Sequence, residues 1–155
     1  MKRVSTLLAV GLAAALGAAA AATASSPAKA GTIVIRHQTH GCHAWSYDGG
    51  AYKAALSVKL ARGGTLTFVD NDMMAHKLIQ TKGVRVVMQK LPSTMMDMSH
   101  EFTGPGVMAH MGASVKVTFT KAGTYAFTTK AGEDYMKGIK TIGEDNVLRL
   151  TVTVS

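Results

Sequence analysis

The stretch TLTFVD, Thr65 to Asp70, decides the fold class, and it runs directly into NDMMAH, residues 71 to 76. Leu66 and Phe68 alternate with the polar residues Thr65 and Thr67, a period of two that predicts a β-strand with one buried face. The following six residues break this pattern and end on a histidine. The stretch therefore predicts a strand and loop that place His76 at one end of a β-sheet.

The same alternation recurs on both sides of this strand, with turn-forming residues between the segments. The alternating segments are Leu56 to Leu60, Val115 to Phe119, Tyr125 to Phe127 and Leu148 to Val154, and the turns are 48–50, 62–64, 81–83 and 121–123. Seven or eight short strands predict an all-β fold, an antiparallel Greek-key β-sandwich. The irregular, methionine-rich segment from Lys90 to Gly112 predicts a long functional or mobile loop.

The N-terminus predicts a secreted protein. A basic lead, Met1 to Arg3, precedes an alanine-rich apolar run and the small-x-small motif Ala28 to Ala30. This order is typical of a secretory signal peptide, whereas a membrane anchor would be longer and less rich in alanine. We expect a signal peptide at 1–30, a single domain at 31–155, a periplasmic or extracellular location, and no stable membrane insertion after processing.

The net charge limits the classes of binding partner, and the cysteine count limits the possible roles of the one thiol. The net charge of +8 falls to +5 once Lys2, Arg3 and Lys29 are removed, and the positive charges are dispersed. This pattern argues against nucleic acid and favours, weakly, an acidic protein or anionic surface. The single Cys42 cannot form an internal disulfide, which leaves burial, pairing with a second chain, or metal ligation. Its neighbours His40, Gly41 and His43 argue against an apolar strand.

Counting strands places the unusual residues at one end of the sandwich. Successive connections of an antiparallel sandwich alternate between its two ends, and one end receives the loops 37–50, 71–76, 90–112 and 130–143. We call this end the ligand pole. It is expected to hold Cys42, most of the methionines, and all six histidines: His37, His40, His43, His76, His100 and His110.

Imidazole, thiolate and thioether together form the ligand set of copper. At these residues the chain resembles the cupredoxins, the plastocyanin and azurin family. The stretch Thr65 to His76 is similar to the family's strand and loop that carry the first copper histidine, which implies His76 as a ligand. Lys121 to Phe127 resembles the strand leading to the main ligand loop, and Tyr135-Met136-Lys137-Gly138 resembles the end of that loop, which implies Met136 as the axial ligand.

The chain departs from this pattern at two ligands. Thr128 stands where the family has cysteine, and Glu133 to Tyr135 stands where it has histidine. We expect Cys42 and a neighbouring histidine to replace them from the first loop. An extended chain would turn His40 and Cys42 to the same side, whereas a turn at Gly41 would bring His43 beside Cys42.

The predicted copper site therefore comprises Cys42, His43, His76 and Met136, with His40 as the close alternative to His43. Whether His110 completes the site is left open, and the Met95 to Met111 region is interpreted as a lid, a docking patch or a weaker Cu(I) site. No nucleophile triad, phosphate loop or paired carboxylates stand out, so we expect a carrier or metal-binding protein rather than an enzyme.

Three functions remain open. The first is single-electron transfer by a secreted copper protein with a redox or copper-handling protein as partner. The second is copper trafficking or resistance through Cu(I) binding. The third is a metal-free β-sandwich scaffold.

Overall fold

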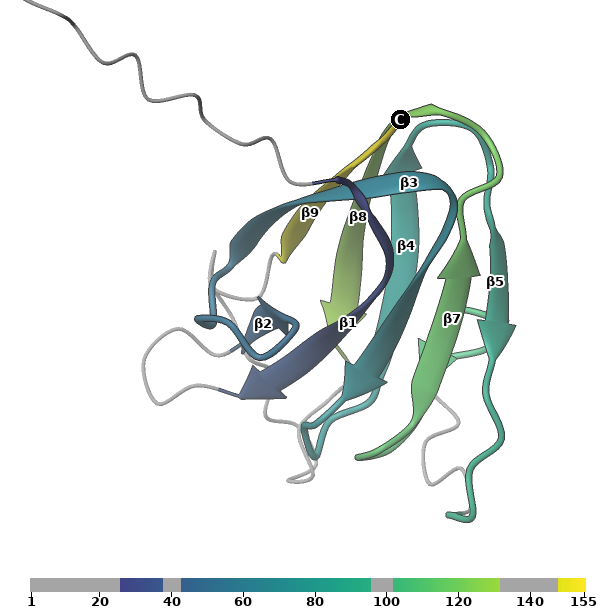
Figure 1. The fold of residues 1–155 in the computed structure, drawn as a ribbon. Coiled ribbons are helices and arrows are strands. Elements are labelled where there is room, and N and C mark those ends of the chain that lie inside the picture. Colours follow the sequence, from purple (N-terminus) through teal and green to yellow (C-terminus); the bar gives the residue numbers. More distant parts are fainter. Residues whose placement is uncertain (1–25, 38–42, 96–101, 132–147) are drawn as a thin grey trace, which may run out of the picture.

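The computed structural model describes residues 26–37, 43–95, 102–131 and 148–155, and every structural statement below concerns these residues. They form nine strands and no helix (Figure 1). The strands are β1 (Ala28–His37), β2 (His43–Tyr47), β3 (Ala55–Asp70), β4 (His76–Lys82), β5 (Val87–Lys90), β6 (Val107–Met108), β7 (Ser114–Thr118), β8 (Gly123–Ala131) and β9 (Arg149–Val154).

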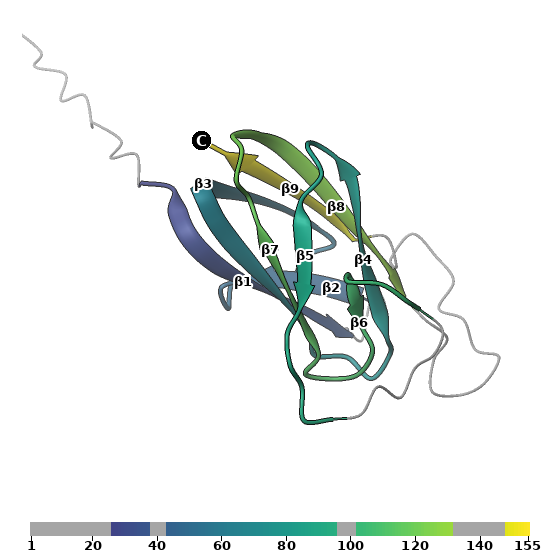
Figure 2. The same cartoon turned by 90° about the vertical axis from the view of Figure 1, so that its right-hand side faces the viewer.

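The strands form two layers that share β3. One layer has the order β2-β1-β3-β7-β5, and the other has the order β3-β9-β8-β4-β6. Figures 1 and 2 show these layers facing each other across the core. The predicted all-β sandwich is thereby confirmed, with two differences. The described residues contain nine strands rather than seven or eight, and β3 pairs in parallel with both β1 and β9.

β3 bends sharply and carries the chain from one layer to the other. Its first part, 55–60, pairs with β9, and its second part, 65–70, pairs with β1 and β7. Gly63 has a φ of +79°, a conformation that favours glycine, and its amide donates to the carbonyl of Phe119 at 2.7 Å. A Cβ on Gly64 would lie 2.7 Å from the carbonyl oxygen of Ala61. The predicted turn is therefore a corner within one strand, and β1 stays parallel to the strand on both sides of it.

The core consists of the inward-facing residues that the alternation predicts. Leu66 and Phe68 are fully buried, and the aromatic rings of Phe119 and Phe127 meet edge to face with centroids 6.0 Å apart. Burial of each such side chain contributes about 1.5–3 kcal/mol. Trp45 on β2 is also fully buried in this core, so the stretch after residue 37, predicted as a loop, contains a packed strand.

The strand pairings place His37, His43 and His76 at one end of the sandwich, as predicted, whereas Cys42, His40 and His100 lie outside the described residues. Ile35 of β1 pairs with Asp70 of β3 in parallel, so both strands end at the pole, and β4 begins there with His76. In Figure 1 the arrowheads of β1 and β3 lie together in the lower part of the picture. The region 90–112 is more structured than predicted, because β6 forms there and Met108 is fully buried in the core.

The N-terminal prediction overlaps the first strand. Residues 1–25 lie outside the described part of the chain, whereas β1 begins at Ala28. Cleavage after Ala30 would remove the first three residues of β1, of which Ala28 and Ala30 pair with β3, and keep the paired stretch from Gly31 to Ile35. In the described ranges, no helix has the length and apolar character needed to cross a bilayer.

Candidate metal centre

Three histidines from separate segments gather at the ligand pole. His43 begins β2 and His76 begins β4, and their exposed fractions are only 1% and 0%. Their rings meet edge to face, with centroids 4.8 Å apart. His37, the exposed last residue of β1, pairs with His43 across the two strands, and these two ring centroids are 5.7 Å apart. The pairing of β1 with β2 thus places two imidazoles beside the one supplied by β4.

A buried carboxylate lies between these imidazoles. The Oδ2 atom of Asp72 is 3.0 Å from His43 Nε2 and 3.4 Å from His76 Nε2. Its other oxygen, Oδ1, accepts a hydrogen bond from the Met74 amide at 3.2 Å, and the Asp72 amide donates to Asp70 Oδ1 at 3.0 Å. These two turns, in which an aspartate side chain binds an amide two residues ahead, fix the loop. They leave Oδ2 of Asp72 directed at the histidines.

The charge of the cluster resides on Asp72. Burial alone would raise the pKa of Asp72, but hydrogen bonds with His43, His76 and the Met74 amide outweigh it and hold this pKa below its usual value. Burial lowers the pKa of His76 and therefore favours its neutral imidazole. Burial raises the pKa of Asp70 to about 9, and the nearby charge of Asp72 adds to this rise. At neutral pH the loop therefore holds one carboxylate and one protonated carboxyl group.

The donors of this cluster fit a metal ion. His37, His43 and Asp72 each offer one ligand atom, and these atoms lie within 4.8 Å of one another. Imidazole nitrogen binds copper and zinc, and carboxylate oxygen binds zinc and tetragonal Cu(II). In addition, Nδ1 of His76 is buried and has no hydrogen-bond partner among the described residues. A buried polar atom of this kind is common where an ion or a water binds.

The structure brings together two of the five predicted ligands, His43 and His76. Cys42, His40 and Met136 lie outside the described residues. The prediction missed Asp72 and did not include His37 in the site. A signal for Asp72 was present, because it stands four residues before His76 in the loop that was predicted to carry that ligand.

The other predicted pole residues have different surroundings. His110 is buried outside this metal-binding group, and its Nδ1 donates to the carbonyl oxygen of Met111 at 2.9 Å. Met74 is buried, whereas Met73, Met95 and Met111 expose 65%, 58% and 45% of their surface. Soft thioether groups are therefore accessible to solvent around the pole.

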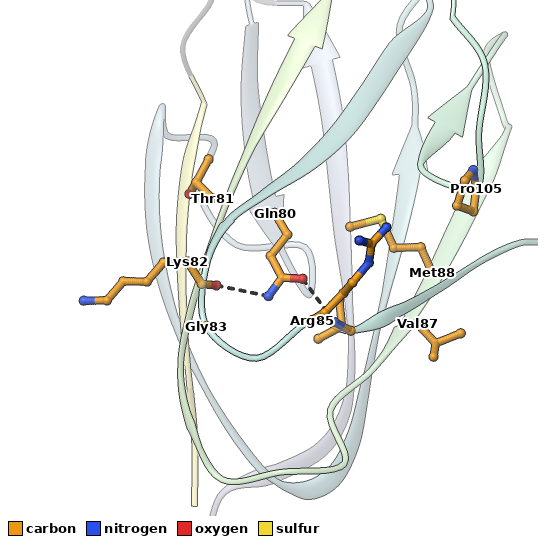
Figure 3. Close-up of a pocket in the computed structure, with 9 residues that line it drawn as sticks. Gln80, Thr81, Lys82, Gly83, Arg85, Val87, Met88 and Pro105 are labelled. Atoms are coloured by element: carbon orange, nitrogen blue, oxygen red, sulfur yellow. Dashed lines mark hydrogen bonds between the residues drawn. The ribbon is translucent and has the colours of Figure 1, made fainter.

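A separate hollow of about 600 Å³ lies near the end of β4 that is farther from the pole (Figure 3). The Gln80 side chain makes three hydrogen bonds to the chain segment that lines this hollow. Its amide nitrogen donates to the carbonyls of Lys82 at 3.1 Å and Val84 at 2.8 Å, and its amide oxygen accepts from the Val86 amide at 3.1 Å. Its described lining residues include no histidine, cysteine or carboxylate. The candidate metal centre is therefore the cluster at the ligand pole.

Comparisons with known proteins identify distant structural neighbours. No family model matches the chain, and a search of curated proteins also found no match. A reduced Cu(I) form of an amicyanin mutant is 15% identical, with 86% of this chain and 88% of that chain covered, at a TM-score of 0.36. A purple cupredoxin from Nitrosopumilus maritimus is 16% identical, with 80% of this chain and 98% of that chain covered, at a TM-score of 0.38. A laccase from Pediococcus acidilactici is 11% identical, with 99% of this chain but only 32% of that chain covered, at a TM-score of 0.43. At these identities and TM-scores the likeness does not assign the chain to a family.

Proposed function

We propose that this chain is a secreted copper-binding protein that carries single electrons and is not an enzyme. The observation that supports this proposal is the convergence of His43 and His76 on one buried carboxylate oxygen. Both histidines were expected as copper ligands from the sequence, and they come from strands that are distant in the chain. The secreted location rests on the basic, apolar and small-x-small segments of residues 1–30.

The protein would hold the ion in a rigid, largely dry setting. His43 and His76 begin strands that are hydrogen-bonded to β1 and β8, so the imidazoles are anchored on both sides of the sandwich. Their burial excludes water from the donor atoms and strengthens electrostatic interactions there. Cys42, His40 and Met136 remain proposed ligands. A bound copper ion would supply the one-electron couple, and a redox or copper-handling protein would be the partner.

Copper trafficking or resistance is the second candidate function. The exposed methionines Met73 and Met111 favour it, because thioether sulfur is a soft donor that suits Cu(I). A trafficking protein would take up Cu(I) and release it to a stronger acceptor, and it would need no stable Cu(II) state.

Metal loading of the purified protein separates these functions. Electron transfer through a thiolate site predicts a strong visible band with Cu(II), which Cys42→Ser should abolish and His43→Gln should weaken or shift. His110→Gln tests the remaining histidine candidate and should leave the band unchanged. A colourless protein that binds only Cu(I) and passes it to a chelator would favour trafficking. Failure to retain any copper after anaerobic loading would refute both functions and leave the scaffold.

A further inference from the structure

We propose that Asp72 is a ligand of the copper site and biases it toward Cu(II) over Cu(I). This inference rests on the proposed function, and it concerns a residue that the sequence pattern did not assign to the site. Three observations support it: the position of Oδ2, the fixed orientation of the carboxylate, and the burial of its charge.

The donor spacing is already that of ligands on one metal ion. Ligand atoms bound at about 2.0–2.2 Å and separated by angles of about 90–109° lie about 2.8–3.6 Å from each other. The distances from Asp72 Oδ2 to His43 Nε2 and His76 Nε2, 3.0 and 3.4 Å, both fall within this range. An ion bound to either imidazole nitrogen would therefore also be within reach of the carboxylate oxygen, without a rearrangement of the loop.

The loop holds the carboxylate in this orientation independently of the histidines. Oδ1 is engaged by the Met74 amide, and the Asp72 amide is engaged by Asp70 Oδ1. The Asp70 backbone is in turn anchored, because its amide donates to the Ala113 carbonyl at 2.9 Å and its carbonyl accepts from the Gly112 amide at 2.6 Å. Oδ2 is therefore preorganised and does not have to be recruited when an ion binds.

The buried negative charge favours the more positive ion. Asp72 is 4% exposed, so little solvent screens its charge from an ion at the neighbouring nitrogens. Carboxylate oxygen is also a harder donor than the thiolate and thioether groups that suit Cu(I). Both effects stabilise Cu(II) more than Cu(I) and oppose the preference that sulfur ligands would impose.

Affinities for the two oxidation states test this assignment. Cu(II) and Cu(I) dissociation constants would be measured by chelator competition for wild type, Asp72→Asn and a control, Asp48→Asn. Asp48 is exposed in the turn after β2, and its φ of 45° is tolerated by asparagine. We expect Asp72→Asn to weaken Cu(II) binding at least tenfold more than Cu(I) binding, which raises the reduction potential by about 59 mV for each tenfold. Asp48→Asn should leave the ratio of the two constants within about twofold of wild type.

The outcomes separate this inference from the proposed function. Equal weakening of Cu(II) and Cu(I) by Asp72→Asn would make Asp72 a structural residue and overturn the inference, while the copper function would stand. A wild-type protein that retains no copper would overturn both. If Asp72→Asn does not fold, infrared difference spectra of wild type with ¹³C-labelled aspartate decide the matter. Cu(II) loading should shift an aspartate carboxylate band, and an unshifted spectrum would refute ligation.

Discussion

Replacing Asp70 with asparagine should stabilise the metal-free protein at alkaline pH and not at acidic pH. The pKa of Asp70 is raised to about 9 in the folded protein, against an ordinary value of 3.8 for an aspartate carboxyl group. Between these values the folded protein holds a proton that the unfolded chain has lost, so the free energy of unfolding falls as the pH rises from about 4 to about 9. Asparagine removes this dependence because it does not titrate.

The size of the effect follows from the same pKa difference. Between pH 3.8 and pH 7 the carboxyl group of Asp70 lowers the free energy of unfolding by at most about 4 kcal/mol, at 1.36 kcal/mol per pH unit. Asparagine keeps the Oδ1 acceptor for the Asp72 amide, but its NH₂ group would occupy the place of Oδ2, which has no hydrogen-bond partner among the described residues. An unsatisfied buried donor costs about 1–3 kcal/mol. We therefore expect a net gain of about 1–3 kcal/mol at pH 7, a larger gain at pH 8, and a net loss at pH 4.

Urea unfolding of chelator-treated wild type and Asp70→Asn at pH 4, 6 and 8 measures this difference. The free energies of unfolding of the two proteins should converge and then cross between the acidic and the alkaline end of the series. A variant that is less stable than wild type by the same amount at every pH would show that Asp70 is ionised in the folded protein, and the charge assignment of the loop would be wrong.

The remaining predictions concern the hydrogen bonds of Gln80, the corner in β3 and stability in acid. Gln80→Ala removes three hydrogen bonds to the loop after β4 and should lower the free energy of unfolding by roughly 1–2 kcal/mol, whereas Gln89→Ala on exposed β5 should change it by less than about 0.5 kcal/mol in the same urea assay. Gly64→Ala places a Cβ against the Ala61 carbonyl oxygen and should lower the thermal midpoint by several degrees; an unchanged midpoint would contradict the close packing of the corner. In the metal-free Asp70→Asn variant, where the opposing titration of Asp70 is absent, stability should fall as the pH drops below about 6.5, because the depressed pKa of His76 makes the unfolded chain bind the proton first. The depressed pKa of Asp72 extends this loss below about pH 4. Urea midpoints of this variant that stay constant from pH 7 to pH 5 would contradict the neutral, buried state of His76.

The strands could be predicted from the sequence because alternation is a local property. Leu66 and Phe68 face the core as expected, and the strand that contains them delivers His76 to the predicted pole. Met108 was assigned to a loop, since a strand of two residues leaves no periodic signal. Its burial results from pairing with His76 across β4 and β6, which is a long-range contact.

Asp72 was missed for a different physical reason, because its position in the loop before His76 does not by itself show that it is buried and faces the histidines. Its role depends on two side chain-to-amide turns within the loop and on the register between β1 and β2, which sets where His43 lies. A loop aspartate is usually exposed, and only the strand pairings show that this one is enclosed. Residue type and spacing indicated His43 and His76, with His40 left as an alternative to His43, but they predicted neither the place of His37 beside His43 nor the charge that lies between the imidazoles.

The hydrogen bonds that keep Asp72 charged also limit what can happen when an ion binds. In the metal-free protein, the imidazole groups of His43 and His76 offset the cost of burying this carboxylate. An ion bound at both Nε2 atoms would use the same nitrogen positions, so neither could then donate a hydrogen bond to Oδ2. The carboxylate would be left buried without those partners, at a cost of several kcal/mol, unless it bound the ion itself. A metal ion at these two Nε2 atoms therefore requires either direct ligation by Asp72 or protonation of Asp72. Protonation would make metal binding take up a proton, which titration in weakly buffered solution would detect.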